Sequence, residues 1–509
     1  MSDKCFDFIS KRVEHCISSD KHKLCHASPS NVSPARLLDV SGDHVRLGQT
    51  KRTRSKYIAL SHCWGSDPLL CITGSTLAQH QDDIDWGALR SLFRDAVQST
   101  RRLGVRYLWI DSLCIIQDSK EDWEIESTKM CDIFEQAHLV LSAVDCASSG
   151  QHCLLPRQRK LKIQYKNSAG KDFQLYARPI VDHHPNTKEQ SPFNLAGPLM
   201  TRAWALQEQA LPNRIVHFTS TELVFECKTT SSCECRPSPR SHPTTPGLLA
   251  KSLLCKKDKA GVFSTWHHFI NSYTLKNITR LSDRLPAISG IAHKVQRSTG
   301  SVYLAGIWQD HVANDLLWLS APFLQNPHLA TRVDEYRAPS FSWASVETQV
   351  QYEKADRDVI SSFLLEFIET QSIPAGLNPL GEVIEGSLTI RAPFMEGIIF
   401  APTEDTFHYS LKVGGQTLDV SPDTLLIEAT LKHGVEERQI VRRAREDEVH
   451  QSFKVPVICL AVSTSSDQRL MGLVLSSSTR VDEAFERLGM FICSHRTFED
   501  VKKTTLKLV

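Results

Sequence analysis

One segment in the first third of the chain alternates short apolar runs with longer amphipathic stretches. The apolar runs 57–61, 107–110 and 138–144 have the length of buried strands. Between them, 84–103 and 120–137 carry apolar residues at the three- and four-residue spacing of helices. Connections of this length favour parallel strands with right-handed crossovers. The pattern therefore predicts an α/β fold built on a parallel sheet.

Reactive side chains follow these predicted strands. In a parallel sheet the carboxyl ends of the strands meet at one edge, where ligands commonly bind. An aspartate there can hold a ligand hydroxyl or cap a turn, and a cysteine can act as a nucleophile or be a buried structural thiol. Two adjacent residues of an extended segment point to opposite faces, so the neighbouring His and Cys are not expected to act on each other. The candidates at this edge are His62, Cys63, Trp64, Gly65, Asp111 and Cys114.

A helix is expected to begin near Arg202 and to end at Leu211, because Pro212 follows and cannot continue it. Trp204 and Glu208 are one helical turn apart and project from the same face. A carboxylate beside an indole can be partly desolvated, which raises its pKa and suits acid/base or electrostatic work on a sugar-like centre. The alternative is a core tryptophan with a solvated glutamate.

The rest of the chain gives a coarser picture. Strand pairs are expected at about 161–165 with 173–177, and at 214–218 with 222–226. A loop is expected at 228–248, then helical periodicity across 262–297 and short strands from about 380 onward. The predicted organisation is a lead-in at 1–50, an α/β domain at 51–230, a linker at 231–260, a mixed helical region at 261–375 and a β-rich region at 376–509.

Composition and motif content argue against several classes of protein and partner. The 509 residues carry 59 Lys and Arg against 58 Asp and Glu, a net charge of +1, so no nucleic-acid partner is expected. No apolar stretch approaches the ~20 residues of a membrane helix, and the N-terminus has no signal-peptide core, so we expect a cytoplasmic protein without a membrane partner. Dinucleotide, Walker A, zinc-protease and nucleophile-elbow motifs are all missing from the sequence. The 15 cysteines are scattered, which favours reduced thiols.

Two groups of cysteine and histidine residues carry side chains that can bind metal ions. One contains Cys16, His22, Cys25 and His26, and the other contains Cys227, Cys233 and Cys235. Neither has the paired Cys-x-x-Cys spacing of a zinc finger. The second group offers three ligands at best, unless the N-terminal group folds over to complete it. The spacing alone predicts neither a metal nor a bound cofactor.

Several motifs occur in an order that resembles the fungal heterokaryon incompatibility (HET) domain family. The family usually has Asn where Ile116 stands and Gly where Ala203 stands. Segments resembling those that often follow the domain occur at 282–290, 303–308 and 338–345. The motifs themselves are Pro34–Val40, Tyr57–Gly65, Tyr107–Gln117 and Arg202–Glu208.

The resemblance implies a trigger of cell death in nonself recognition. It also implies a fold related to the Toll/interleukin-1 receptor (TIR) domain, a parallel sheet with flanking helices, which in this chain is followed by the mixed helical and β-rich C-terminal region expected from its residue pattern. Some TIR domains cleave NAD at the nicotinamide–ribose bond, using a Glu four residues after a Trp. Trp204 and Glu208 match that spacing.

The candidate catalytic residues are Glu208, Asp111, Cys114, His62 and Cys63, and the resemblance implies that Glu208 acts on NAD as the substrate. Two other hypotheses stay open. The chain could be a non-catalytic module that binds a protein partner or self-assembles, or a small-molecule biosynthetic enzyme that uses the same crevice at the carboxyl ends of the strands. The candidate binding residues are Trp64, Gly65, Gln117, Arg202, Trp204 and Gln207.

Overall fold

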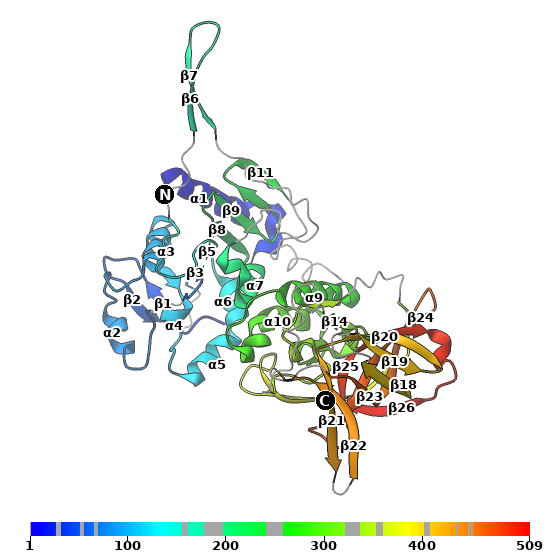
Figure 1. The fold of residues 1–509 in the computed structure, drawn as a ribbon. Coiled ribbons are helices and arrows are strands. Elements are labelled where there is room, and N and C mark those ends of the chain that lie inside the picture. The colour runs from blue at the N-terminus through cyan, green and yellow to red at the C-terminus, as the bar shows by residue number, and fades with distance from the viewer. Residues whose placement is uncertain are drawn as a thin grey trace. The chain divides into compact units, whose positions relative to one another are not determined.

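The chain consists of two compact units, Met1–Cys255 and Lys256–Val509 (Figure 1). Among the residues described, no helix has both the length and the apolar character needed to cross a membrane. The computed structural model describes residues 2–26, 32–50, 55–65, 70–154, 161–177, 197–240, 258–320, 336–352, 360–401, 408–433, 436–445, 448 and 451–509.

A nine-stranded sheet forms the centre of the first unit, in the order β11-β10-β9-β8-β5-β3-β4-β1-β2. The four central strands run parallel: β4 (Tyr107–Trp109), β3 (Tyr57–Ser61), β5 (Leu139–Ala143) and β8 (Arg214–Phe218). The outer strands pair antiparallel, so the sheet is mixed and the prediction of a parallel sheet holds for its centre. The outer strands are β1 (Arg36–Asp39), β2 (Arg46–Gln49), β9 (Leu223–Cys227), β10 (Ser231–Cys233) and β11 (Arg236–Arg240).

Helices cover both faces of this sheet. The Tyr57 hydroxyl donates a 2.5 Å hydrogen bond to the Ile133 carbonyl in α6 (Met130–Gln136). On the other face, the His62 ring meets Phe93 of α3 (Ser91–Arg102) at 5.3 Å. Side chains alternate between the faces of a strand, so residues on β3 and just after it reach α6 and α7 on one face and α3 on the other. The other helices are α1 (Asp3–Ser18), α2 (Leu77–Asp82), α4 (Asp111–Cys114), α5 (Lys120–Thr128) and α7 (Ala203–Ala210), with 3-10 turns η1 (Asp20–Cys25) and η2 (Pro198–Thr201).

Two expected helices differ from those observed. The helix expected from residue 84 begins only at Ser91, because Ile84 forms an isolated β-bridge with Val45 and a turn follows. The helix expected over 120–137 is broken at Lys129, which separates α5 from α6. In both places a local tertiary contact or break interrupts a continuous apolar pattern.

Polar segments contribute more strands than the sequence indicated. The lead-in supplies β1 and β2, and Arg36 of β1 donates from Nε to the Cys114 carbonyl at 2.8 Å. The expected loop at 228–248 contains β10 and β11, and its remainder from 241 lies outside the described residues. Outer strands such as β2, β10 and β11 are held by backbone pairing and need no apolar alternation, so their composition resembles that of a loop.

The predicted hairpins are confirmed. β8 pairs with β9 across a short turn, and β6 (Leu161–Lys166) pairs with β7 (Asp172–Ala177). The side chains of β6 are exposed along its whole length. The second hairpin therefore adds nothing to the core of the first unit.

The second unit begins with helices α9 (Lys259–Tyr273) and α10 (Ser289–Thr299) and continues as a β-rich region, as predicted. Six strands pair in a closed cycle, β18-β19-β20-β25-β24-β23, because β18 also pairs with β23. The strands expected from about 380 onward were short, whereas the first of them here is one long strand, β18 (Val383–Ala401). The other main strands are β16 (Ile360–Phe363), β17 (Glu366–Pro374), β19 (Tyr409–Val413), β20 (Gln416–Pro422), β21 (Leu426–His433), β22 (Glu436–Arg443), β23 (Phe453–Ser465), β24 (Arg469–Ser477), β25 (Phe485–Ser494) and β26 (Lys503–Leu508).

Short elements connect the helices of the second unit to its sheet. They are η3 (Leu281–Arg284), η4 (Pro286–Ile288), β12 (Tyr303–Leu304), β13 (Ile307–Trp308), η5 (Gln309–His311), α11 (Val312–Asp315), β14 (Trp318–Ser320), η8 (Trp343–Ser345) and β15 (Val350–Tyr352), and η9 (His495–Phe498) precedes β26.

A buried ion cluster lies in the second unit. Asp423 accepts a 2.9 Å hydrogen bond from the Nη2 atom of Arg487 and a 2.8 Å bond from the Nη2 atom of Arg443. The Arg487 guanidinium also lies 3.6 Å from the centre of the Trp318 ring and donates to the Trp318 carbonyl. One carboxylate thus balances two buried cations.

Candidate functional site

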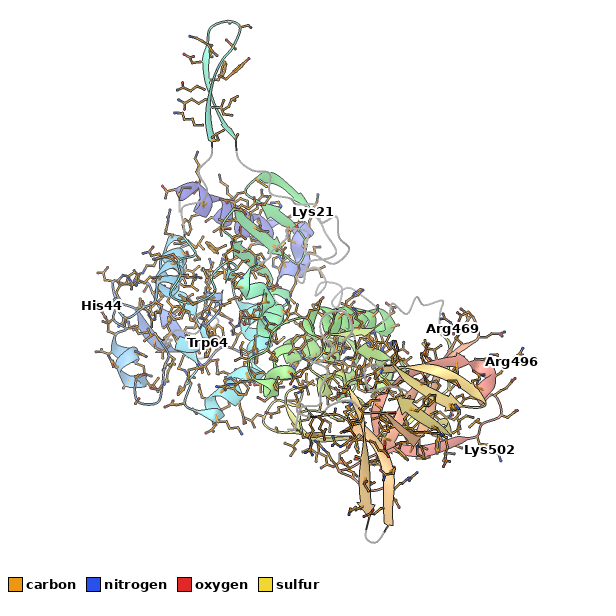
Figure 2. All side chains as sticks on the ribbon, viewed as in Figure 1. Lys21, His44, Trp64, Arg469, Arg496 and Lys502 are labelled. Carbon is orange, nitrogen blue, oxygen red and sulfur yellow. The ribbon has the colours of Figure 1, made fainter. Side chains whose placement is uncertain are left out.

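Three of the predicted residues meet at the carboxyl edge of β3 and β4. Trp64, labelled in Figure 2, donates from Nε1 to Oδ2 of Asp111 at 2.7 Å. The Nδ1 atom of His62 lies 3.8 Å from Oδ1 of the same carboxylate. Asp111 is 26% exposed, whereas His62 is buried. The carboxylate therefore forms the accessible part of this group.

Asp111 also begins helix α4. Its Oδ1 atom accepts a 2.7 Å hydrogen bond from the Ser112 amide, which satisfies one backbone donor of the first turn. Gln117 donates from Nε2 to the carbonyls of Ile115 at 2.8 Å and of Asp111 at 3.3 Å. Asp111 therefore caps the first turn through Oδ1, and a ligand hydroxyl could still reach its carboxylate because the side chain is partly exposed, although Oδ2 also accepts the Trp64 bond.

A second carboxylate at this site comes from helix α7, far along the chain from β3. Glu208 of α7 accepts a 2.5 Å hydrogen bond from the Ser61 hydroxyl at the end of β3. Only 8% of Glu208 is exposed. Burial raises its pKa to about 7, against the opposing effects of the Arg202 charge and the Ser61 hydrogen bond, and the Asp111 charge adds to the rise. Both protonation states are therefore populated near neutral pH, as acid/base chemistry requires.

Arg202 connects these groups. It precedes α7 and donates from Nη1 to the carbonyl of His62. Its charge acts on the pKa of Glu208 and on that of Cys63, lowering both. Arg202 is half-buried, so a cation adjoins the buried carboxylate and is still in contact with solvent.

The two thiols at this edge lie in apolar surroundings. Cys63 packs against Leu199 and Ala205, and burial raises its pKa. Cys114 is fully buried, and burial raises its pKa to about 12. A thiolate is the reactive form of cysteine, so this environment does not favour a cysteine nucleophile. His62 faces Phe93 of α3, away from Cys63, as the strand alternation requires.

The remaining predicted residues surround Glu208 and Trp64. Trp204 is half-buried one turn before Glu208, and Gln207 is fully buried beside it. Gly65 has a φ of +79°, and a Cβ placed there would lie 2.3 Å from Cβ of Ser148. Only glycine fits this turn without a clash.

The structure brings His62, Trp64, Asp111, Arg202 and Glu208 together, and it places the Cys114 thiol in the core. Sequence reasoning missed Ser61 as a partner of Glu208. The available signal was a hydroxyl residue at the end of an otherwise apolar strand, immediately before the candidate His62. Ser61 is fully buried and is paired in register with Ser142 of β5.

One comparison with known proteins gives a match. The family model described as "Heterokaryon incompatibility protein (HET)" matches residues 57–208, from the first residue of β3 to Glu208 itself. No curated protein and no solved structure matches the chain significantly.

Proposed function

Because residues 57–208 form a domain of the heterokaryon incompatibility family, we propose that the chain is a fungal effector of nonself recognition that triggers cell death by cleaving NAD. The observation that carries this proposal is Glu208, a buried carboxylate with a pKa raised to about 7 that is hydrogen-bonded to the carboxyl end of the parallel strand β3. Trp204 one turn earlier gives the spacing that the TIR resemblance associates with NAD cleavage.

Glu208 acts on the charge that develops at the ribose. When the bond between ribose C1′ and the nicotinamide nitrogen breaks, its electron pair leaves with neutral nicotinamide, and the ribose becomes oxocarbenium-like. A preorganised carboxylate stabilises this positive charge more than it stabilises the ground state. Water then forms the new bond to C1′ and releases a proton to Glu208 or to solvent. The products are nicotinamide and ADP-ribose.

The neighbouring residues would bind the rest of the dinucleotide. The half-buried Trp64 and Trp204 offer aromatic faces for a base or the nicotinamide ring. Asp111 can accept hydrogen bonds from ribose hydroxyls, and Gln117 can hydrogen-bond ribose or phosphate. Arg202 offers a cation to the phosphates. These residues are all half-buried, whereas Glu208 is buried.

The test is nicotinamide release by the purified full chain, measured by chromatography at several protein concentrations and with a crowding agent. The Glu208→Gln variant keeps the size of the side chain and an acceptor for Ser61, so its fold should persist. Exposed Glu121→Gln on α5 makes the same chemical change at the surface and serves as the control. We expect release by wild type and Glu121→Gln, and a loss of at least ~100-fold in Glu208→Gln.

Two results would overturn the proposal. Absence of release by wild type at every concentration, crowded or not, would exclude NAD cleavage by this chain. Equal release by Glu208→Gln would exclude Glu208 as its centre. If the chain kills cells and Glu208→Gln does so equally, an interaction module that binds a partner or self-assembles explains the toxicity.

A further inference from the structure

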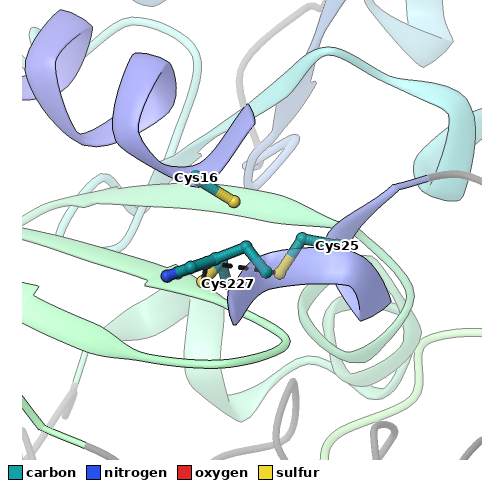
Figure 3. Close-up of side chains that lie close together, drawn as sticks. Cys16, Cys25 and Cys227 are labelled. Carbon is teal, nitrogen blue, oxygen red and sulfur yellow. Dashed lines mark hydrogen bonds between the residues drawn. The ribbon is translucent and has the colours of Figure 1, made fainter. Parts of the chain in front are cut away.

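Four metal-binding side chains converge where the N-terminal segment meets the sheet of the first unit. Cys16 comes from the last turn of α1, His22 and Cys25 from η1, and Cys227 from the end of β9. Their ligand atoms all lie within 4.8 Å of one another, and all four residues are buried. Figure 3 shows the three thiols arriving from separate segments of the chain.

The two distances from His22 to the thiols of Cys227 and Cys25 are close to those of a tetrahedral site. The Nδ1 atom of His22 lies 3.4 Å from Sγ of Cys227 and 3.7 Å from Sγ of Cys25. Zinc bonds of about 2.3 Å to sulfur and about 2.0 Å to nitrogen, at tetrahedral angles, separate the ligand atoms by roughly 3.5 to 3.8 Å. Three cysteines and one histidine form one of the usual ligand sets of structural zinc. We propose that Cys16, His22, Cys25 and Cys227 bind one structural zinc ion.

The surroundings of the sulfur atoms suit thiolates. The Thr230 amide donates to Sγ of Cys227 at 3.3 Å, and the Thr229 hydroxyl lies 3.3 Å from Sγ of Cys25. Arg214 reaches Sγ of Cys16 at 4.0 Å and donates to the Cys25 carbonyl at 3.0 Å. Donors and a cation at this distance stabilise negative sulfur, which is the form that binds zinc.

Two other groups in the described residues have metal-binding side chains, and both are weaker candidates. Glu222, Cys233 and Cys235 provide three ligands, with Cys235 only partly buried. In the second unit, His267 and His311 both lie 2.7 Å from the same oxygen of Asp315, so hydrogen bonds already account for that arrangement. Both groups serve as internal controls.

The ion would fasten the N-terminal segment to the sheet. Cys227 lies 202 positions beyond Cys25, and β9 is the strand that pairs with β8 of the parallel core. The N-terminal group does meet the second group, an arrangement that the sequence left open, but only Cys227 of the second group takes part, and His26, Cys233 and Cys235 do not. It departs from the prediction of no metal that the spacing gave. The proposed zinc ligands and the proposed catalytic residues of the unit have no residue in common.

The first measurement is the metal content of the full chain, purified without chelator from zinc-supplemented cells. We expect about one zinc per chain. Cobalt exchanged into the site should give the visible bands of tetrahedral coordination and a thiolate-to-cobalt charge-transfer band in the near ultraviolet. A chain that holds less than a tenth of an equivalent of zinc and shows no cobalt bands would overturn the proposal, with no variant needed.

Variants then locate the ion. Cys227→Ser and Cys16→Ser should each lose most of the zinc and of the charge-transfer intensity. Cys5→Ser is the matched control, because Cys5 is also buried on α1 but lies outside the group. Cys235→Ser and His311→Ala report on the other two groups. Full zinc content in Cys227→Ser would refute the assignment. The same conclusion would follow if Cys235→Ser or His311→Ala lost the zinc while Cys227→Ser retained it.

A disulfide is the competing use of these thiols. Mass measurement of the native chain after alkylation separates the two cases, since zinc-bound thiols remain reduced and are released together by a chelator. A disulfide between any two of the three cysteines in the freshly purified chain, with zinc absent, would overturn the proposal. Neither result depends on whether the chain cleaves NAD.

Discussion

The Ser61 hydroxyl donates a 2.5 Å hydrogen bond to Oε2 of Glu208, which lies 147 positions later in the chain. This bond joins the end of the first parallel strand to the last helix of the HET domain. It partly offsets the burial that raises the pKa of Glu208 to about 7. The protonation state of the proposed catalytic group is therefore set by contacts that only the folded domain provides.

The proposed activity should depend on pH through Glu208. Ionised Glu208 stabilises the oxocarbenium-like ribose, so nicotinamide release should rise about tenfold per pH unit below pH ~7 and level off above it. The measurement is a pH–rate profile under saturating NAD between pH 5 and 9. A rate that falls with increasing pH over this range would contradict the role of the carboxylate.

Two substitutions should shift the midpoint of this pH–rate profile in opposite directions. Asp111→Asn removes a negative charge that raises the pKa of Glu208, so the midpoint should shift to lower pH. Ser61→Ala removes a hydrogen bond that lowers the pKa, so the midpoint should shift to higher pH. The position of the midpoint is the readout, because Asp111 is also proposed to bind the ribose. Identical midpoints in both variants would show that another group controls the profile.

Glu208 should also make stability depend on pH. Because its pKa is raised from 4.5 to about 7, the folded chain binds more protons than the unfolded chain between these values. The free energy of unfolding therefore falls as pH rises through this window, by about 3 kcal/mol in total. Glu208→Gln removes this dependence, so its free energy of unfolding should increase relative to that of wild type by up to this amount between pH 4.5 and pH 8.

Calorimetric unfolding of wild type and Glu208→Gln at pH 4.5 and pH 8 measures this difference in stability. Glu121→Gln, at an exposed position, is the control. An advantage of Glu208→Gln that is equal at pH 4.5 and pH 8 would mean that the carboxyl group is not desolvated in the folded chain.

Gly65→Ala should damage the turn that carries Trp64. Its φ of +79° is unfavourable for alanine, and the new Cβ would lie 2.3 Å from Cβ of Ser148. We expect a loss of about 3 kcal/mol or more in the free energy of unfolding. Gly104→Ala is the matched control, with a φ of +67° and no atom within 4 Å of the new Cβ, and should lose only about 1 kcal/mol. Equal losses in the two variants would rule out the contact with Ser148 as the cause.

Asp423→Ala should strongly destabilise the second unit. It leaves the buried guanidinium groups of Arg443 and Arg487 without their carboxylate, which costs about 3–5 kcal/mol. Asp467→Ala breaks a solvent-exposed pair with Arg469 and should change the unfolding midpoint little. Denaturant unfolding of both variants tests this contrast. A similar midpoint for the two would show that Arg443 and Arg487 find other partners.

The sequence by itself determined the parallel centre of the first unit. Strands 57–61, 107–110 and 138–144 and the helices between them were readable because buried strands are short and apolar and helices repeat every three to four residues. The β-rich character of the second unit followed from the same signals. The sequence also gave most of the candidate edge residues, since the topology places the carboxyl ends of parallel strands together.

Only the tertiary structure decided which of these residues meet. The outer strands β2, β10 and β11 are largely polar and have no apolar alternation, so pairing rather than local sequence makes them strands. The contact of Ser61 with Glu208, and that of Cys227 with the N-terminal Cys16, His22 and Cys25, join residues far apart in the chain. Local patterns report which residues are buried, but the packing of distant segments sets their partners, and the partners fix pKa values and metal-binding geometry.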